Sequence, residues 1–196
     1  VLTSTTALYG HAVVAGGCRW IDEDTEPLPR TIYHRTKLQA EALAEAAASE
    51  AFAVRVLRMG RCFPEPPERM AMFRLHRGLD ARDVASAHAA LLHNGGAPFQ
   101  RYIACAPTPF RREDCLELAT QPRRVLARRA PQLLAEFERR GWPLPLSIDR
   151  VYDGSRAVAV LGWQPRYGPD DVLQQYAAGS IEVLPRTQWL KDRVVE

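Results

Sequence analysis

The chain has 196 residues, of which 46% are hydrophobic and 25% charged, and its formal net charge is +3. These proportions are those of an ordinary globular protein with one large domain, and so small a charge excess does not indicate nucleic-acid binding. No apolar run approaches the roughly 20 residues that a membrane helix needs, and no signal peptide is visible, so we expect a cytoplasmic protein with no membrane or nucleic-acid partner.

The first half of the chain has the alternating strand and helix pattern of a parallel α/β sheet. The helices are predicted from apolar residues at helical spacing and from cap residues such as Thr31, and the strands from short β-prone runs. In chain order, the sequence predicts a strand at 1–4, a loop at 9–30, a helix at 31–50, a strand at 52–59, a proline loop at 64–67, a helix from Asp80 or Asp83 to 93, and a strand at 100–104.

After Pro107 the sequence becomes arginine-rich and mostly helical. Helices are predicted at about 111–119, 121–128, 130–140, 155–161 and 169–178, with a tail at 182–196. The basic stretch 123–140 alternates with Leu126, Leu133, Leu134 and Phe137, so we interpret it as a set of solvated helix faces and not as a polyanion site.

Tyr33 and Lys37 form the chain's clearest chemical motif, a YxxxK near the start of the first predicted helix. Residues four apart lie on one helix face, so the phenol and the ammonium can address the same site. An ammonium near a phenol stabilises the phenolate and lowers a pKa that is otherwise near 10, as a general acid/base requires. The chain contains 24 arginines and only two lysines, which makes a lysine at this position more informative. The alternative is a surface helix with an amphipathic tyrosine.

A hydroxyl-rich run, Thr3-Ser4-Thr5-Thr6, follows directly from the first predicted strand. Open α/β sheets bind their ligands at the carboxyl ends of their strands, so a hydroxyl there is a candidate for substrate binding. The alternative is a strand end whose hydroxyls bond their own backbone.

Together these motifs resemble the extended short-chain dehydrogenase/reductase family, the NAD-dependent epimerases and dehydratases. The resemblance rests on four segments: Thr3 to Gly10, Tyr33 to Glu41, Asp80 to Ala87 and Asp153 to Pro165. It implies an α/β fold with an incomplete Rossmann-like parallel sheet and a small, mostly helical C-terminal substrate region. The implied organisation is the C-terminal half of an NAD(P)-binding domain at 1–105, a substrate-binding region at 106–181 and a tail at 182–196.

The resemblance also implies roles for individual residues. Tyr33 would be the general acid/base, Lys37 would lower its pKa and hold the nicotinamide ribose, and Thr5 would bind the substrate oxygen. Ser4 and Pro64 would lie near the cofactor, NAD or NADP, with no preference indicated. The candidate substrate contacts are Arg74 and Arg82, followed by His76 and Trp142.

The implied activity is that of an NAD(P)-dependent oxidoreductase or epimerase/dehydratase acting on a hydroxyl or ketone, with sugar nucleotides as one candidate class. A homodimer through the Tyr33 helix is implied as well, since alanines such as Ala40, Ala44, Ala47 and Ala48 allow close helix approach. The alternative is a non-catalytic, truncated relic of the fold that acts as an interaction protein.

The family's Gly-rich phosphate turn has no counterpart in this sequence, and the resemblance begins at the strand of the catalytic hydroxyl. We therefore expect either a fragment, which we favour, or a natural truncation. An unpaired sheet edge predicts poor stability or self-association of the isolated chain. The four cysteines (Cys18, Cys62, Cys105, Cys115) and the histidines show no metal-ligand spacing, so we expect no metal, and we expect the cysteines to be reduced and mostly buried thiols.

Overall fold

The computed structural model describes residues 1–10 and 16–184. It contains the strands β1 (Leu2–Thr5), β2 (Arg19–Ile21), β3 (Val54–Met59), β4 (Phe99–Ala104) and β5 (Arg150–Tyr152). The helices are α1 (Ile32–Ala47), α2 (Pro67–His76), α3 (Ala81–Leu92), α4 (Cys115–Thr120), α5 (Pro122–Arg129), α6 (Pro131–Arg140), α7 (Ser155–Leu161) and α8 (Pro169–Ala177), with short 3-10 helices η1 (Thr6–Tyr9) and η2 (Arg112–Asp114). None of the helices in these ranges is long and apolar enough to cross a membrane.

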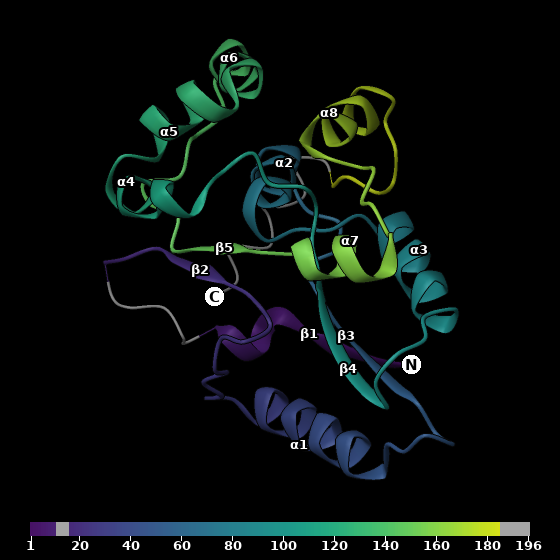
Figure 1. Ribbon diagram of the computed structural model, residues 1–196. Coiled ribbons are helices and arrows are strands. Elements are labelled where there is room, and N and C mark those ends of the chain that lie inside the picture. Colours follow the sequence, from purple (N-terminus) through teal and green to yellow (C-terminus); the bar gives the residue numbers. More distant parts are fainter. Residues whose placement is uncertain (11–15, 185–196) are drawn as a thin grey trace.

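Two parallel sheets organise the chain, which confirms the predicted α/β class. The larger sheet has the order β1-β3-β4, and the smaller sheet pairs β2 with β5. In Figure 1, α1 lies on one side of the larger sheet, and α3 and α7 lie on the other. β1 is an edge strand: within the described residues, no strand pairs with its outer side.

The two faces of the larger sheet differ in character because successive side chains of a strand point to opposite sides. Leu57 and Tyr102 point toward α3 and α7, where they join a buried apolar cluster with Leu91 and Trp163. Arg58, the next residue after Leu57, instead contacts Glu41 of α1. The α1 side of the sheet therefore has a polar centre.

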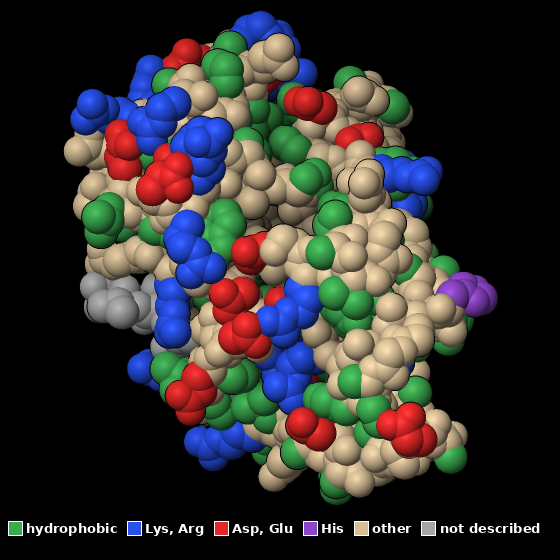
Figure 2. Space-filling model, in the orientation of Figure 1, with side chains coloured by type: hydrophobic (Ala, Val, Ile, Leu, Met, Phe, Trp, Pro, Cys, Tyr) green, Lys and Arg blue, Asp and Glu red, His purple; other side chains and the backbone are tan. Residues whose placement is uncertain are grey.

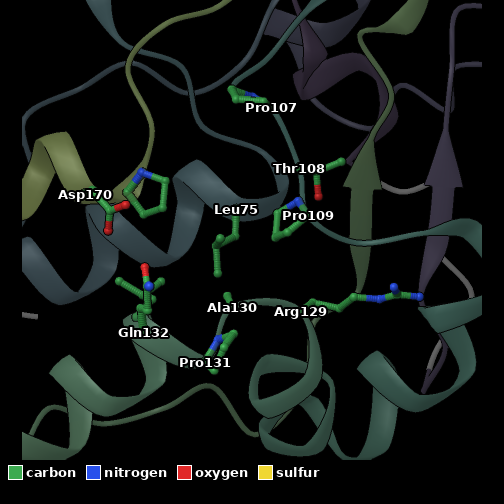
Figure 3. Close-up of a pocket in the computed structure, with 11 residues that line it drawn as sticks. Leu75, Pro107, Thr108, Pro109, Arg129, Ala130, Pro131, Gln132 and Asp170 are labelled. Atoms are coloured by element: carbon green, nitrogen blue, oxygen red, sulfur yellow. The ribbon is translucent and has the colours of Figure 1, made fainter.

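The second core lies among the helices of the C-terminal half. Phe137 and Trp142 pack edge to face, with ring centroids 5.3 Å apart, and both contribute to a cluster that joins α2, α5, α6 and α8. A cavity of about 400 Å³ remains between α2, the α5–α6 junction and the start of α8 (Figure 3). Figure 3 shows mostly proline and aliphatic side chains around it, and its arginine, Arg129, is paired with Asp114 at 2.9 Å. This cavity therefore has few groups with which to do chemistry.

Most of the predicted elements are present within one to three residues of their expected bounds, including the caps Thr31 and Asp80. Two strands and one α-helix were missed. β2 lies within the stretch 9–30 that was predicted as loop, β5 was not predicted, and α2 begins at the last proline of the predicted loop 64–67. Strands of three residues are too short for an alternating pattern to be read, and Pro67 occupies the first turn of α2, where a proline is tolerated.

Two further expectations concern the cysteines and the tail. Only Cys105 is buried, while Cys18, Cys62 and Cys115 are half-buried, so the expectation of mostly buried thiols is wrong. The predicted tail at 182–196 lies outside the described residues from position 185 onward.

Candidate active site

A cleft of about 480 Å³ opens at the carboxyl ends of β1 and β3, where ligands of open α/β sheets bind. Side chains from β1, η1, α1, β5 and the loop after β3 line it. The lining residues are Thr3, Ser4, Thr5, Thr6, Ala7, Gly10, Tyr33, His34, Lys37, Met59, Gly60, Arg61, Phe63, Arg77, Arg150 and Tyr152. The cleft thus gathers the hydroxyl run, the YxxxK pair and three arginines.

Thr5 ends β1 and caps η1. Its Oγ1 accepts a hydrogen bond from the backbone N–H of Ala7 at 3.1 Å, as an N-cap residue does. Among the described residues, the Thr5 hydroxyl donates to none, so its proton is available to an acceptor in the cleft. The side chain of Ser4 differs: it is buried and donates to Glu41.

Tyr33 and Lys37 enter the cleft from the first turns of α1, which Thr31 caps by accepting from the backbone N–H of His34 at 3.2 Å. The Tyr33 side chain is 50% exposed, and its hydroxyl has no hydrogen bond to any described residue. Lys37 Nζ donates to the carbonyl of Thr3 at 3.2 Å. An ammonium has three donors, so Lys37 is held against β1 with donors to spare.

The carboxylate of Glu41 holds α1 against the larger sheet. It lies one turn beyond Lys37, is only 2% exposed, and pairs with Arg58 of β3 at 2.6 Å. Ser4 donates to the same carboxylate, and Arg58 also donates to the hydroxyl of Tyr9. Burial raises the pKa of Tyr9 to about 12, so this phenol stays protonated. This buried network therefore supports the part of α1 that carries Tyr33 and Lys37.

Two glycines bring two arginines to the opposite wall. A Cβ at Gly60 would lie 2.9 Å from the carbonyl oxygen of Arg77, and a Cβ at Gly78 would lie 2.9 Å from the backbone of Phe73. Without these side chains the backbones approach closely, and Arg61 N–H donates to the Arg77 carbonyl at 3.0 Å. Arg61 and Arg77 are thereby adjacent, although many positions separate them in the chain.

The three cleft arginines differ in how their charge is compensated. Arg61 pairs with Glu65 at 2.7 Å and Arg150 pairs with Asp149 at 2.5 Å. Arg77 has no ion pair with a described residue, its Nε is buried without a hydrogen bond, and its guanidinium stacks 3.9 Å from the Phe73 ring centroid. Burial lowers the pKa of Arg77. Arg77 therefore has no ion pair among the described residues, although the charge of Asp149, the partner of Arg150, also acts on it.

The structure brings Thr5, Tyr33 and Lys37 together in the cleft, whose lining also includes the buried Ser4, and it places the other candidates elsewhere. Pro64 is exposed outside the cleft lining, while its neighbour Phe63 is part of it. Arg74 is buried against Asp80 at 3.0 Å, and Arg82 pairs with the same carboxylate. These two arginines hold the start of α3, and neither lines the cleft.

The remaining candidates pack inside the protein. Trp142 belongs to the helical core, and His76 is buried with its Nδ1 2.9 Å from the carbonyl of Arg150. Sequence reasoning missed Arg61, Arg77 and Arg150 as cleft residues. The signal available for the first two was the pair of isolated glycines, Gly60 and Gly78, each beside an arginine, since isolated glycines mark close backbone approaches.

Solved structures with a similar fold include proteins described with NADPH or NAD and proteins described as epimerases. RMD from Pseudomonas aeruginosa complexed with NADPH is 21% identical with a TM-score of 0.52, covering 90% of this chain and 66% of that one. A putative NAD-dependent epimerase/dehydratase from Methylobacillus flagellatus is 23% identical (TM-score 0.53; 90% and 61% covered). UDP-glucuronic acid 4-epimerase from Bacillus cereus in complex with NAD is 15% identical (TM-score 0.51; 89% and 61% covered).

The chain thus spans less than two thirds of the length of each of these structures. At these identities the similarity shows the fold alone. No protein-family model and no curated protein matches the sequence.

Proposed function

We propose that the cleft is the reaction site of an NAD(P)-dependent oxidoreductase or epimerase/dehydratase that acts on a hydroxyl or ketone. The observation that carries this proposal is the convergence of Thr5 of β1 with Tyr33 and Lys37 of α1 on one cleft at the carboxyl ends of two parallel strands. A proton-transfer group, a cation beside it and a hydroxyl donor are the set that such chemistry requires.

The donor set of the cleft fits the nicotinamide-ribose end of such a cofactor. Lys37 has spare ammonium donors and Tyr33 has an unpaired hydroxyl, so both can bind the ribose hydroxyls. The cofactor, when bound, supplies hydride transfer. The solved structures of similar fold described with NADPH and with NAD support this assignment without favouring either cofactor.

Tyr33 moves the proton in this proposal. Its hydroxyl oxygen takes the proton of a substrate hydroxyl, or returns it to a ketone oxygen in the reverse direction. The Lys37 ammonium, four residues along the same helix face, stabilises the phenolate form. Thr5 donates its free proton to the substrate oxygen and keeps that oxygen near Tyr33.

Arg77 supports a substrate that carries an anionic group. An arginine that is partly buried and unpaired is costly, and a phosphate or carboxylate would satisfy its planar donors. Arg61 lies beside it on the same wall. Among anionic substrates, sugar nucleotides are the class we favour, because the epimerases of similar fold are named for such compounds.

The test is a titration with NADH and NADPH, followed by turnover assays with a panel of sugar nucleotides. Tyr33→Phe should lower kcat by a factor of about 10² to 10⁴, a far larger effect than its weakening of cofactor binding through the lost hydroxyl. Lys37→Ala should weaken cofactor binding, whereas Arg35→Ala, on an exposed position of α1, should not. A folded chain that binds neither dinucleotide would overturn the proposal for these 196 residues. The alternative, a relic that only binds partners, is less well supported because it gives no reason for the three groups to converge.

A further inference from the structure

The residues on either side of Thr5 are both attached to one buried ion pair. The pair is Glu41 of α1 with Arg58 of β3, 2.6 Å apart. Ser4, directly before Thr5, donates to the Glu41 carboxylate, while Arg58 donates to the hydroxyl of Tyr9, the last residue of η1. Thr5 itself caps η1. The segment that carries the Thr5 hydroxyl is therefore attached to the same ion pair both before and after this residue.

This network lies out of reach of water and of a ligand. Its four side chains are each at most 3% exposed. Arg58 Nε also donates to both carboxylate oxygens of Glu41, at 3.1 and 3.2 Å, which fixes the orientation of the carboxylate. Of the four, only Ser4 is part of the cleft lining, and its proton is given to Glu41. A satisfied buried network makes its surroundings rigid, so this one acts on the cleft through the residues that it holds.

The ammonium of α1 has its own attachment to β1. Lys37 lies one turn before Glu41, and its Nζ donates to the carbonyl of Thr3 at 3.2 Å. This bond does not pass through Ser4 or the ion pair. Loss of one link of the network should therefore displace Thr5 more than it displaces Lys37.

We propose that Ser4 and Tyr9 are positioning residues, which through the Glu41–Arg58 pair set the distance between the Thr5 hydroxyl and Tyr33. This inference rests on the proposed function, in which both hydroxyls meet the same substrate oxygen. Such groups act only when the reacting atoms are about 3–3.5 Å apart, and a displacement of about 1 Å can cost about 10²-fold in rate. Loss of the Ser4 or Tyr9 hydroxyl should therefore lower kcat and leave the affinity for the cofactor unchanged.

The experiment measures turnover and NADH affinity for Ser4→Ala and Tyr9→Phe, each of which removes one hydroxyl and keeps the ion pair. We expect kcat to fall about 10- to 100-fold in each variant, with the Kd for NADH as in the wild type. Tyr102→Phe is the matched control, because it removes a buried hydroxyl of the same sheet that donates to Gln100 at 3.0 Å, outside the network. It should change neither quantity.

Hydrogen exchange at the Ala7 amide, followed by NMR, tests the same attachment without any activity. This amide donates to Thr5 Oγ1 at 3.1 Å, so it reports how firmly Thr5 is held. Its exchange should become several-fold faster in Ser4→Ala and Tyr9→Phe, whereas the amides of β4 should exchange as in the wild type.

Three results would overturn the proposal. The first is unchanged exchange at Ala7 in both variants, and the second is equal acceleration at all amides, which would mark a merely structural role. The third is weaker NADH binding by Ser4→Ala with kcat unchanged, which would make Ser4 a cofactor contact. A wild-type chain that binds no dinucleotide would instead overturn the proposed function, while the exchange at Ala7 would still decide whether the network holds Thr5.

Discussion

The cleft and the α4–α6 region are both rich in arginine, but they use it differently. In α4–α6, Arg128 pairs with Asp114 and Glu117, and Arg139 and Arg140 both pair with Glu136. Figure 2 shows acidic side chains interspersed with the basic ones over these helices. In the cleft, Arg77 has no ion pair with a described residue, and its Nε is buried without a hydrogen bond. The number of arginines in a region therefore does not indicate a ligand site. An arginine with no ion pair is a better indication of one.

The largest effect is expected beneath the cleft, from Glu41→Gln. This change leaves the buried Arg58 without its counter-charge, and breaking a buried pair costs about 3–5 kcal/mol of the free energy of unfolding. Urea denaturation followed by fluorescence measures it. Glu45→Gln, one turn further along α1, removes a more exposed pair with Arg101 and should change stability far less. Equal losses in the two variants would show that burial does not distinguish these pairs.

The second effect is a pH dependence that originates in His76. Burial lowers its pKa from 6.5 to about 3, so between these values the unfolded chain binds a proton that the folded chain does not. The free energy of unfolding should therefore be unaffected by His76 above pH 6.5 and fall as the pH drops below it, by about 2 kcal/mol at pH 5.

His76→Asn is the matched variant, because an amide can still donate to the Arg150 carbonyl. Denaturation at several pH values between 5 and 7 should give a flatter profile for this variant than for the wild type. Parallel profiles would mean that another group titrates in this window.

The third effect separates binding from stability at Arg77. Arg77→Met removes a partly buried charge together with its guanidinium contact on Phe73, so stability should change little, while the affinity for pyrophosphate, measured by calorimetry, should fall about tenfold. Arg139→Met in α6 should leave the affinity unchanged. A loss of stability with no loss of affinity would assign Arg77 a purely structural role.

The smallest effect is expected from Glu136→Gln in α6. Its partners Arg139 and Arg140 hold the pKa of this carboxyl near 2, but the group is at the surface, where solvent screens such pairs. The melting temperature should stay within error of the wild type and be insensitive to added salt. A clear, salt-sensitive destabilisation would contradict the view that these helices carry merely solvated charge.

The sequence predicted the local parts of the fold well because those parts depend on neighbours in the chain. Thr31 caps α1, and the spacing of Tyr33 and Lys37 places both on one face of that helix. β2 and β5 were missed because each is held by the other, far along the chain, and neither has a pattern of its own.

The same limit applies to the site. Tyr33, Lys37 and Thr5 could be proposed from motifs, but the arginines were chosen wrongly for the cleft, since Arg74 faces Asp80 and Arg77 faces the cleft only because of how α2 ends. Whether the isolated chain self-associates through the outer edge of β1 stays a prediction.

The close approach at Gly60 and Gly78 has a consequence for protein engineering. The backbone that carries Arg61 and Arg77 tolerates no Cβ at these glycines, whereas the two arginine side chains themselves line the cleft. The backbone of this cleft wall is thus constrained, whereas the side chains at positions 61 and 77 can be replaced. A combinatorial library that randomises positions 61 and 77, while both glycines are kept, would explore new substrate charges without rebuilding the scaffold.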